Sequence, residues 1–252
     1  AAELAEHIVE QQLWWPTGVA PDTLAAALVP MHDTVLGPLA DGLTLRDIGM
    51  HDRLRELDFE IPLARGDLRD AQIPDVRLAD MGAVLREHLA PADPMWPYAD
   101  RLMSVALGGQ SLRGYLSGSI DVVLRVPDGD SHRYLVVDYK TNRLGDPDRL
   151  MTAADYGRTQ LVQAMLHSDY PLQALLYSVV LHRFLRWRQP DYVPEVHFGG
   201  VLYLFVRGMC GPDTPTVDGH PAGVFSWLPP SALVTELSDL LDRGRITEKR
   251  GE

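Results

Sequence analysis

The sequence has almost no cysteine and no long apolar run. Its single cysteine, Cys210, excludes both an internal disulfide and a cysteine-based zinc site, and it is typical of a reducing compartment. No stretch of 18 or more apolar residues occurs, and the first residues lack the basic-then-apolar pattern of a secretory signal. These absences predict a soluble, cytoplasmic protein with no membrane association.

Lysine is also scarce, because Lys140 and Lys249 are the only two among 23 basic residues. The formal net charge is −12, and most of it lies in residues 1–100, where 18 acidic residues outnumber 7 basic ones. Residues 101–252 are nearly balanced, with 17 acidic and 16 basic residues. A charge of this sign is unfavourable for an independent DNA-binding protein. No G-x-x-x-x-G-K-[ST] motif is present, so no ATP site is expected.

The most informative stretch is residues 114–142, GYLSGSIDVVLRVPDGDSHRYLVVDYKTN. Apolar residues alternate along Leu116–Val126 and again along Tyr134–Tyr139, with a Pro-Asp-Gly-Asp turn between the two runs. This pattern predicts a β-hairpin. A turn centred on Asp128-Gly129 would have φ > 0 at both positions.

That turn sets a register in which Asp121 lies opposite Val136 and Ser119 lies opposite Asp138. Asp121 and Asp138 would then be diagonal neighbours on one face, about 7–8 Å apart at Cα, with Lys140 two residues further along the same face. Two carboxylates repel each other and lose hydration when they are buried. A divalent cation such as Mg²⁺ removes both costs. The spacing alone favours equally a surface hairpin in which Lys140 pairs with Asp138 on the solvent side.

Three ordered segments carry a family resemblance: Gly118-Ser119-Ile120-Asp121, then Val137-Asp138-Tyr139-Lys140-Thr141-Asn142, then Gln173-x-x-x-Tyr177. This set resembles the RecB-type branch of the PD-(D/E)xK nucleases, and the similarity is continuous over residues 56–208. The resemblance implies an α/β fold with a mixed central sheet flanked by helices. It also implies Mg²⁺-dependent hydrolysis of DNA phosphodiesters by the nuclease module of a helicase–nuclease that acts in double-strand-break repair and recombination.

The resemblance also implies a role for each motif residue. Asp121, Asp138 and the carbonyl group of Tyr139 would bind the metal ion. Lys140 would activate or position the attacking water. Glu56, at the start of an expected first strand, would contribute to the metal shell through water, although periodicity alone makes it a solvated strand residue.

Gln173 and Tyr177 are four residues apart and share one face of an expected helix. In the family this face lies beside the metal hairpin and supports the lysine or contacts DNA. Without the family, the same pair is an ordinary core tyrosine with a polar neighbour.

One family feature is missing. The family carries a metal-binding histidine in a Gly-Thr-x-x-His pattern on a helix upstream of the first strand, and this chain has no such pattern. Because the chain begins at Ala1 without a methionine, we expect a fragment whose metal site is incomplete. A nuclease-like scaffold that binds DNA-repair partner subunits without cutting is therefore the alternative function.

The expected organisation is a helical N-terminal segment, residues 1–51, followed by a nuclease domain, residues 52–252. Expected partners are DNA, the helicase portion of the same polypeptide, and RecC- and RecD-like subunits. Apolar periodicity predicts helices over 2–12, Tyr156–His167, Tyr170–Arg188 and Ser231–Arg243, and strands over Leu57–Leu63 and Val196–Arg207.

Overall fold

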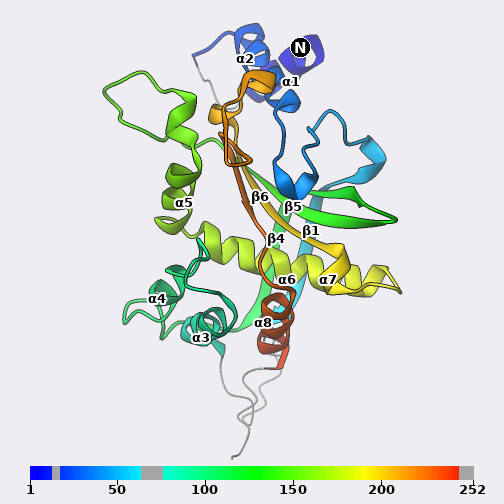
Figure 1. Cartoon of the computed structure of the whole chain (residues 1–252), viewed down its shortest axis with the longest axis vertical. Coiled ribbons are helices and arrows are strands. Elements are labelled where there is room, and N and C mark those ends of the chain that lie inside the picture. The colour runs from blue at the N-terminus through cyan, green and yellow to red at the C-terminus, as the bar shows by residue number, and fades with distance from the viewer. Residues whose placement is uncertain (13–17, 64–75, 244–252) are drawn as a thin grey trace, which may run out of the picture. The chain divides into compact units, whose positions relative to one another are not determined.

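The computed structural model describes residues 1–12, 18–63 and 76–243. Its helices are α1 (Ala2–Gln12), α2 (Pro21–Leu28), α3 (Leu78–His88), α4 (Tyr98–Leu102), α5 (Arg158–Leu166), α6 (Tyr170–Arg188), α7 (Pro194–His197) and α8 (Ser231–Arg243). Its strands are β1 (Arg53–Leu63), β2 (Val76–Arg77), β3 (Ser111–Leu112), β4 (Gly114–Asp128), β5 (Ser131–Lys140), β6 (Phe198–Phe205), β7 (Thr216–Val217), β8 (His220–Pro221) and β9 (Val224–Trp227). Figure 1 shows these elements along the chain.

The main sheet is mixed, and within the described residues it has five strands in the order β1-β4-β5-β6-β9. Two small antiparallel pairs, β2-β3 and β7-β8, complete the strand pairing of these residues. The α/β class predicted from the sequence is confirmed. No helix in the described ranges is long and apolar enough to cross a membrane.

The chain divides into two compact units, each made of three stretches. Unit 1 comprises Ala1–Met50, Tyr139–Leu161 and Tyr203–Ser226. Helices α1 and α2 of this unit pack through Ala5, Ile8 and Ala25. Deeper in unit 1, the buried hydroxyl of Thr34 lies 3.2 Å from that of Thr214 and accepts a hydrogen bond from the backbone of Gly211.

Unit 2 comprises His51–Asp138, Val162–Leu202 and Trp227–Glu252. Within it, β1 and β4 form a long antiparallel pair, and α6 crosses these two strands (Figure 1). Helix α8 packs against α3 and α6. Arg183 of α6 donates hydrogen bonds to the hydroxyl and carbonyl groups of Ser238 in α8, which join these two helices.

Several predicted elements agree closely with the structure. The predicted helices 2–12, Tyr170–Arg188 and Ser231–Arg243 coincide with α1, α6 and α8. In β1 the side chains of Leu57, Phe59 and Ile61 are half-buried while their neighbours are exposed, as the alternation predicted. The helix predicted to begin at Tyr156 begins instead at Arg158, because Ala153–Tyr156 form a separate 3-10 helix, which begins with a capping box between Thr152 and Asp155.

The hairpin is confirmed, but its predicted register is wrong. Val123, and not Asp121, is paired with Val136, and the last pair before the turn is Asp128 with Ser131. The two-residue loop is therefore Gly129-Asp130, one residue later than predicted. Only Gly129 in this loop has a positive φ, of 57°. A turn with glycine at its first central position needs no aspartate at φ > 0, which explains the shift.

Candidate functional site

The hairpin register brings Asp121 and Asp138 together. Val122 is paired with Val137, so one further step along the two strands sets Asp121 opposite Asp138. The corrected register thus makes the two residues direct rather than diagonal neighbours. Side chains directly opposite each other in an antiparallel pair have Cβ atoms about 4.5–5.5 Å apart. The two carboxylates are therefore closer than the predicted register implied.

Asp138 is buried, with only 4% of its surface exposed, and Asp121 is half-buried. Their neighbours in the two strands, Val122, Val136 and Val137, are buried apolar residues. Two like charges in such surroundings repel each other and have lost part of their hydration. Hard oxygen donors in this arrangement suit a divalent cation, which would relieve both effects.

Glu56 lies in β1, which pairs with β4 on the side opposite β5. The pairs Arg55 with Val122 and Leu57 with Ile120 bracket it, so its position in β1 corresponds to that of Asp121 in β4. Its backbone has φ = 50°, which is unusual for a residue with a side chain. Its side chain is exposed. In the part of the chain that the structure describes, no three or more His, Cys, Asp or Glu side chains converge to hold a metal ion. The pairing of the strands thus aligns the backbone positions of Glu56, Asp121 and Asp138.

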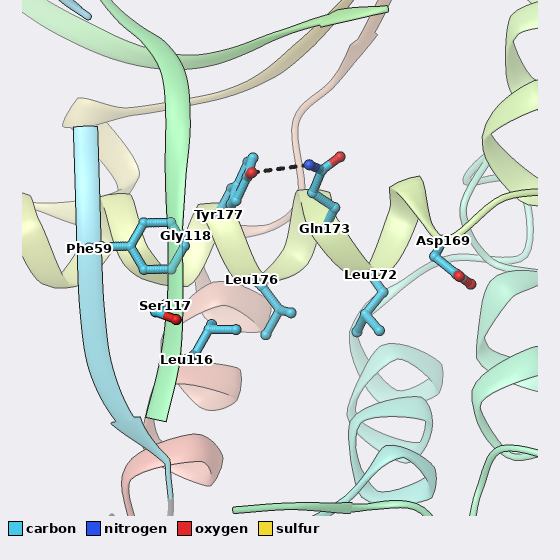
Figure 2. A pocket seen from close by; sticks show the side chains of 9 residues that line it. All are labelled: Phe59, Leu116, Ser117, Gly118, Asp169, Leu172, Gln173, Leu176 and Tyr177. Atoms are coloured by element: carbon cyan, nitrogen blue, oxygen red, sulfur yellow. Dashed lines mark hydrogen bonds between the residues drawn. The ribbon is translucent and has the colours of Figure 1, made fainter. Parts of the chain in front are cut away.

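Tyr177 and Gln173 connect α6 to β4. The hydroxyl of Tyr177 donates a 2.8 Å hydrogen bond to the carbonyl oxygen of Ser119 and accepts one of 3.0 Å from Nε2 of Gln173. Phe59 of β1 meets the Tyr177 ring edge-on, with 5.9 Å between ring centroids. Figure 2 shows both polar side chains pointing from α6 toward the same side. Tyr177, together with Gln173, is therefore in direct contact with β4 of the hairpin.

The surroundings of Tyr177 raise the pKa of its hydroxyl group. Burial raises the pKa of its hydroxyl, while the hydrogen bond from Gln173 lowers it. The negative charges of Asp138 and Asp121 raise this pKa further. The phenol group thus stays protonated and lies within electrostatic range of both carboxylates.

Lys140 follows Asp138 by two residues in β5, with Tyr139 between them, so the alternation of the strand directs both charged side chains to one face. Nζ of Lys140 lies 5.2 Å from the ring centroid of the buried Tyr203. This cation–π contact restricts the ammonium group near the end of the strand. Both Tyr139 and Lys140 are half-buried.

Within unit 1, the segment after Lys140 is held by two residues that the sequence analysis did not single out for this position. Arg207 donates a 2.8 Å hydrogen bond to the carbonyl oxygen of Thr141. The buried Tyr156 donates to the carbonyl oxygen of Asn142 at 2.9 Å and lies 3.2 Å from the backbone nitrogen of Leu144. No motif in the sequence identifies these contacts, because Tyr156 follows the hairpin by several residues and Arg207 only ends an apolar run.

Comparison with known proteins identifies close relatives. The chain is 66% identical over 251 residues to "RecBCD enzyme subunit RecB" of Mycobacterium tuberculosis, a match that covers 98% of the chain and 22% of that protein. It is 64% identical over 241 residues to the protein of the same name from Mycolicibacterium smegmatis, covering 96% of the chain and again 22% of the relative. With the Escherichia coli protein of that name it shares 38% identity over 131 residues, about half of the chain.

The chain is therefore similar to these RecB proteins over nearly its whole length, and it spans about a fifth of the length of the two relatives named first. No profile of a known protein family matches it.

Proposed function

We propose that this chain is the nuclease module of a RecB-like subunit and that it hydrolyses DNA phosphodiester bonds with Mg²⁺. The observation that carries this proposal is the position of Asp121 opposite the buried Asp138, with Lys140 two residues further along the same strand. The homology with RecB supports it. We propose the PD-(D/E)xK nuclease core as the fold type of this α/β structure, in a nuclease domain of residues 52–252 that follows the helical segment 1–51.

The donor set fits magnesium. The carboxylates of Asp121 and Asp138 and the carbonyl oxygen of Tyr139 are hard oxygen ligands, and Glu56 is available to bind through water. A Mg²⁺ ion held there would act as a Lewis acid toward the scissile phosphate.

The residues of the chain supply the other functions. Lys140 offers a positive charge to a phosphate oxygen and a hydrogen bond that orients the attacking water. Its contact with Tyr203 limits how far the ammonium group moves. Tyr177 and Gln173 tie the backbone of Ser119 to α6, so the strand segment that leads to Asp121 is held against a helix. Such positioning residues support catalysis without touching the substrate.

The acidity of the chain suggests how DNA arrives. With a net charge of −12, the chain has little of the electrostatic attraction that drives independent DNA binding. We therefore propose that the rest of the polypeptide, with its helicase portion, and RecC- and RecD-like subunits deliver DNA to it. In this setting the reaction serves double-strand-break repair and recombination.

The test is release of acid-soluble nucleotides from linear single-stranded and double-stranded DNA by the chain, with Mg²⁺ or with a chelator. Asp138→Asn removes one ligand charge at nearly constant shape. We expect it to reduce cleavage about 100-fold or more. This loss is larger than the one typical of residues that contact the ligands of a metal ion and not the ion itself. Asp148→Asn, at an exposed aspartate in the loop after β5, is the matched control and should leave cleavage unchanged.

A second candidate function is a nuclease-like scaffold that binds partner subunits without cutting. The excess of acidic residues in the first hundred positions favours it. It predicts that Asp138→Asn leaves DNA processing by the assembled enzyme unchanged. Mg²⁺-dependent cleavage that Asp138→Asn abolishes would exclude the scaffold, whereas equal processing by wild type and variant would exclude the nuclease.

A further inference from the structure

Lys140 is the last residue of β5, and the backbone that follows it belongs to neither helix nor strand. Thr141, Asn142 and Arg143 are exposed to solvent. Exposed segments of this kind open locally at little cost in free energy, because few packed contacts hold them. The position of a side chain at the end of a strand is therefore poorly fixed unless other residues hold the backbone after it. Two side chains of unit 1 do so.

The first of these side chains is Tyr156, which is completely buried. Its hydroxyl donates a 2.9 Å hydrogen bond to the carbonyl oxygen of Asn142 and accepts one of 3.2 Å from the backbone nitrogen of Leu144. The backbone of Tyr156 is held as well, since its carbonyl oxygen accepts a 2.9 Å hydrogen bond from the backbone nitrogen of Gly223. One buried phenol thus fixes both ends of the segment 142–144.

The second side chain is Arg207. Its Nε donates a 2.8 Å hydrogen bond to the carbonyl oxygen of Thr141, the residue directly after Lys140. Arg207 immediately precedes Gly208, and a Cβ atom at Gly208 would lie only 2.4 Å from Cβ of Tyr156. The absence of a side chain at Gly208 therefore lets Tyr156 pack directly against the backbone next to Arg207. The two hydrogen-bonding side chains thus come from a single packed region of unit 1.

The short 3-10 helix that carries Tyr156 is itself held in place. Asp155 accepts hydrogen bonds from the backbone and the hydroxyl of Thr152, and it pairs with Arg149. A Cβ atom at Gly145, where φ is 89°, would lie 2.7 Å from Cγ of Asp155. The loop after the hairpin therefore passes close to this helix, and the hydroxyl of Tyr156 has a fixed position from which to hold the backbone.

The side chain of Lys140 depends on this support. Its Nζ lies over the ring of the buried Tyr203, 5.2 Å from the ring centroid. A cation–π contact is weak compared with the rotamer entropy of a lysine side chain. It restrains the ammonium group only if the backbone from which the side chain extends is fixed. The hydrogen bonds from Tyr156 and Arg207 supply this restraint.

We propose that Tyr156 and Arg207 are positioning residues for Lys140. By holding the backbone directly after it, they keep the ammonium group over the ring of Tyr203, where it orients the attacking water. The inference rests on the function proposed above. Neither residue needs to contact DNA in this role, because a displacement of a reacting group by about 1 Å is enough to lower a rate about 100-fold.

The experiment uses the small number of lysines. The chain has only Lys140 and Lys249, so lysine-selective ¹³C labelling in the Lys249→Arg background leaves the ε-methylene NMR signal of Lys140 alone. We expect the ring current of Tyr203 to shift this signal upfield from that of free lysine. Tyr156→Phe, which removes one hydroxyl and keeps the ring, should move it back toward free lysine. The same variant should lower kcat for Mg²⁺-dependent DNA cleavage about 10–100-fold and leave KM unchanged.

Two variants at Arg207 separate its hydrogen bond from its charge. Glutamine has an N–H donor at the same distance along the side chain as Nε of arginine but carries no charge, and methionine has neither. Arg207→Gln should therefore keep the Lys140 signal and kcat of the wild type, whereas Arg207→Met should change both as Tyr156→Phe does. Equal losses in the two variants would assign the effect to the charge and overturn the positioning role of Arg207.

Tyr192→Phe is the matched control, because it removes a phenol hydroxyl that lies 3.1 Å from Nδ1 of His182 in unit 2. It should lower the free energy of unfolding without changing the Lys140 signal or kcat, and a change like that of Tyr156→Phe would overturn the proposal. A lower kcat in Tyr156→Phe with an unchanged Lys140 signal, or a shifted signal with an unchanged kcat, would also overturn it. If the wild-type chain cleaves no DNA, the nuclease is overturned, and the Lys140 signal alone decides whether Tyr156 and Arg207 hold Lys140.

Discussion

The hydroxyl of Tyr177 donates a 2.8 Å hydrogen bond to the carbonyl oxygen of Ser119, two residues before Asp121 in β4. A tyrosine in the middle of a long helix thus fixes the backbone of the strand that carries a candidate metal ligand. The same hydroxyl accepts a hydrogen bond from Gln173. Tyr177 and Gln173 therefore act as positioning residues, because they affect the site by holding the strand backbone.

Removing this hydroxyl should affect cleavage and stability together. Tyr177→Phe removes two hydrogen bonds, one to the carbonyl of Ser119 and one from the amide of Gln173, so we expect a loss of about 1–3 kcal/mol in the free energy of unfolding. Cleavage should fall about 10–100-fold. Denaturant unfolding and nucleotide release measure the two effects. Tyr115→Phe, at an exposed tyrosine of β4, should change neither, and an unchanged cleavage rate in Tyr177→Phe would contradict the positioning role.

The backbone conformation of Glu56 predicts how glycine and alanine variants at this position differ in stability. At φ = 50° a residue with a side chain is less stable than glycine by about 1 kcal/mol or more. Glu56→Gly should therefore be more stable to denaturant than Glu56→Ala. At Glu60, an exposed residue of the same strand outside the positive-φ set, glycine should instead be less stable than alanine by about 0.5–1 kcal/mol. The same order at both positions would show that Glu56 carries no backbone strain.

His182 predicts an acid-sensitive fold. It is only 2% exposed, and its Nδ1 lies 3.1 Å from the hydroxyl of Tyr192. Burial, assisted by the charges of Arg186 and Arg183, lowers the pKa of His182 to about 4. An unfolded chain has a histidine pKa of about 6.5, so it binds a proton between about pH 6.5 and 4 that the folded chain excludes.

The free energy of unfolding should therefore decrease as the pH falls through this window, by up to about 3 kcal/mol. Denaturant unfolding at several pH values measures the slope. His182→Asn should flatten it, even though the variant is less stable at neutral pH. His51→Asn, at an exposed histidine, should keep the slope of the wild type, and an equal slope in all three proteins would rule out His182 as its source.

The sequence was sufficient to predict the elements whose apolar pattern is strong. Helices α6 and α8 and the alternating strand β1 follow from the period of their apolar residues. The register of the hairpin was not predictable in the same way. A shift of its turn from Asp128-Gly129 to Gly129-Asp130 preserves the faces of both strands, so the hydrophobic pattern does not distinguish the two registers.

The contacts that shape the site depend on residues far apart in the sequence. The hydrogen bonds from Tyr156 to Asn142 and from Arg207 to Thr141 join segments whose proximity arises only after folding. The positive φ of Glu56 is likewise invisible in a strand pattern, because periodicity describes side-chain faces and carries no information on local backbone strain. The roles of the carboxylates and of Lys140 remain predictions.

The most direct test of the central claim, that the carboxylates of Asp121 and Asp138 bind a divalent cation, is a titration with Mn²⁺ followed by the electron paramagnetic resonance signal of the free ion. Mn²⁺ accepts the same carboxylate and carbonyl ligands as Mg²⁺. We predict that the wild-type chain binds Mn²⁺, that Asp138→Asn binds it at least about tenfold more weakly, and that Lys140→Ala retains binding while losing cleavage. Equal Mn²⁺ affinity in the wild type and in Asp138→Asn would contradict the account.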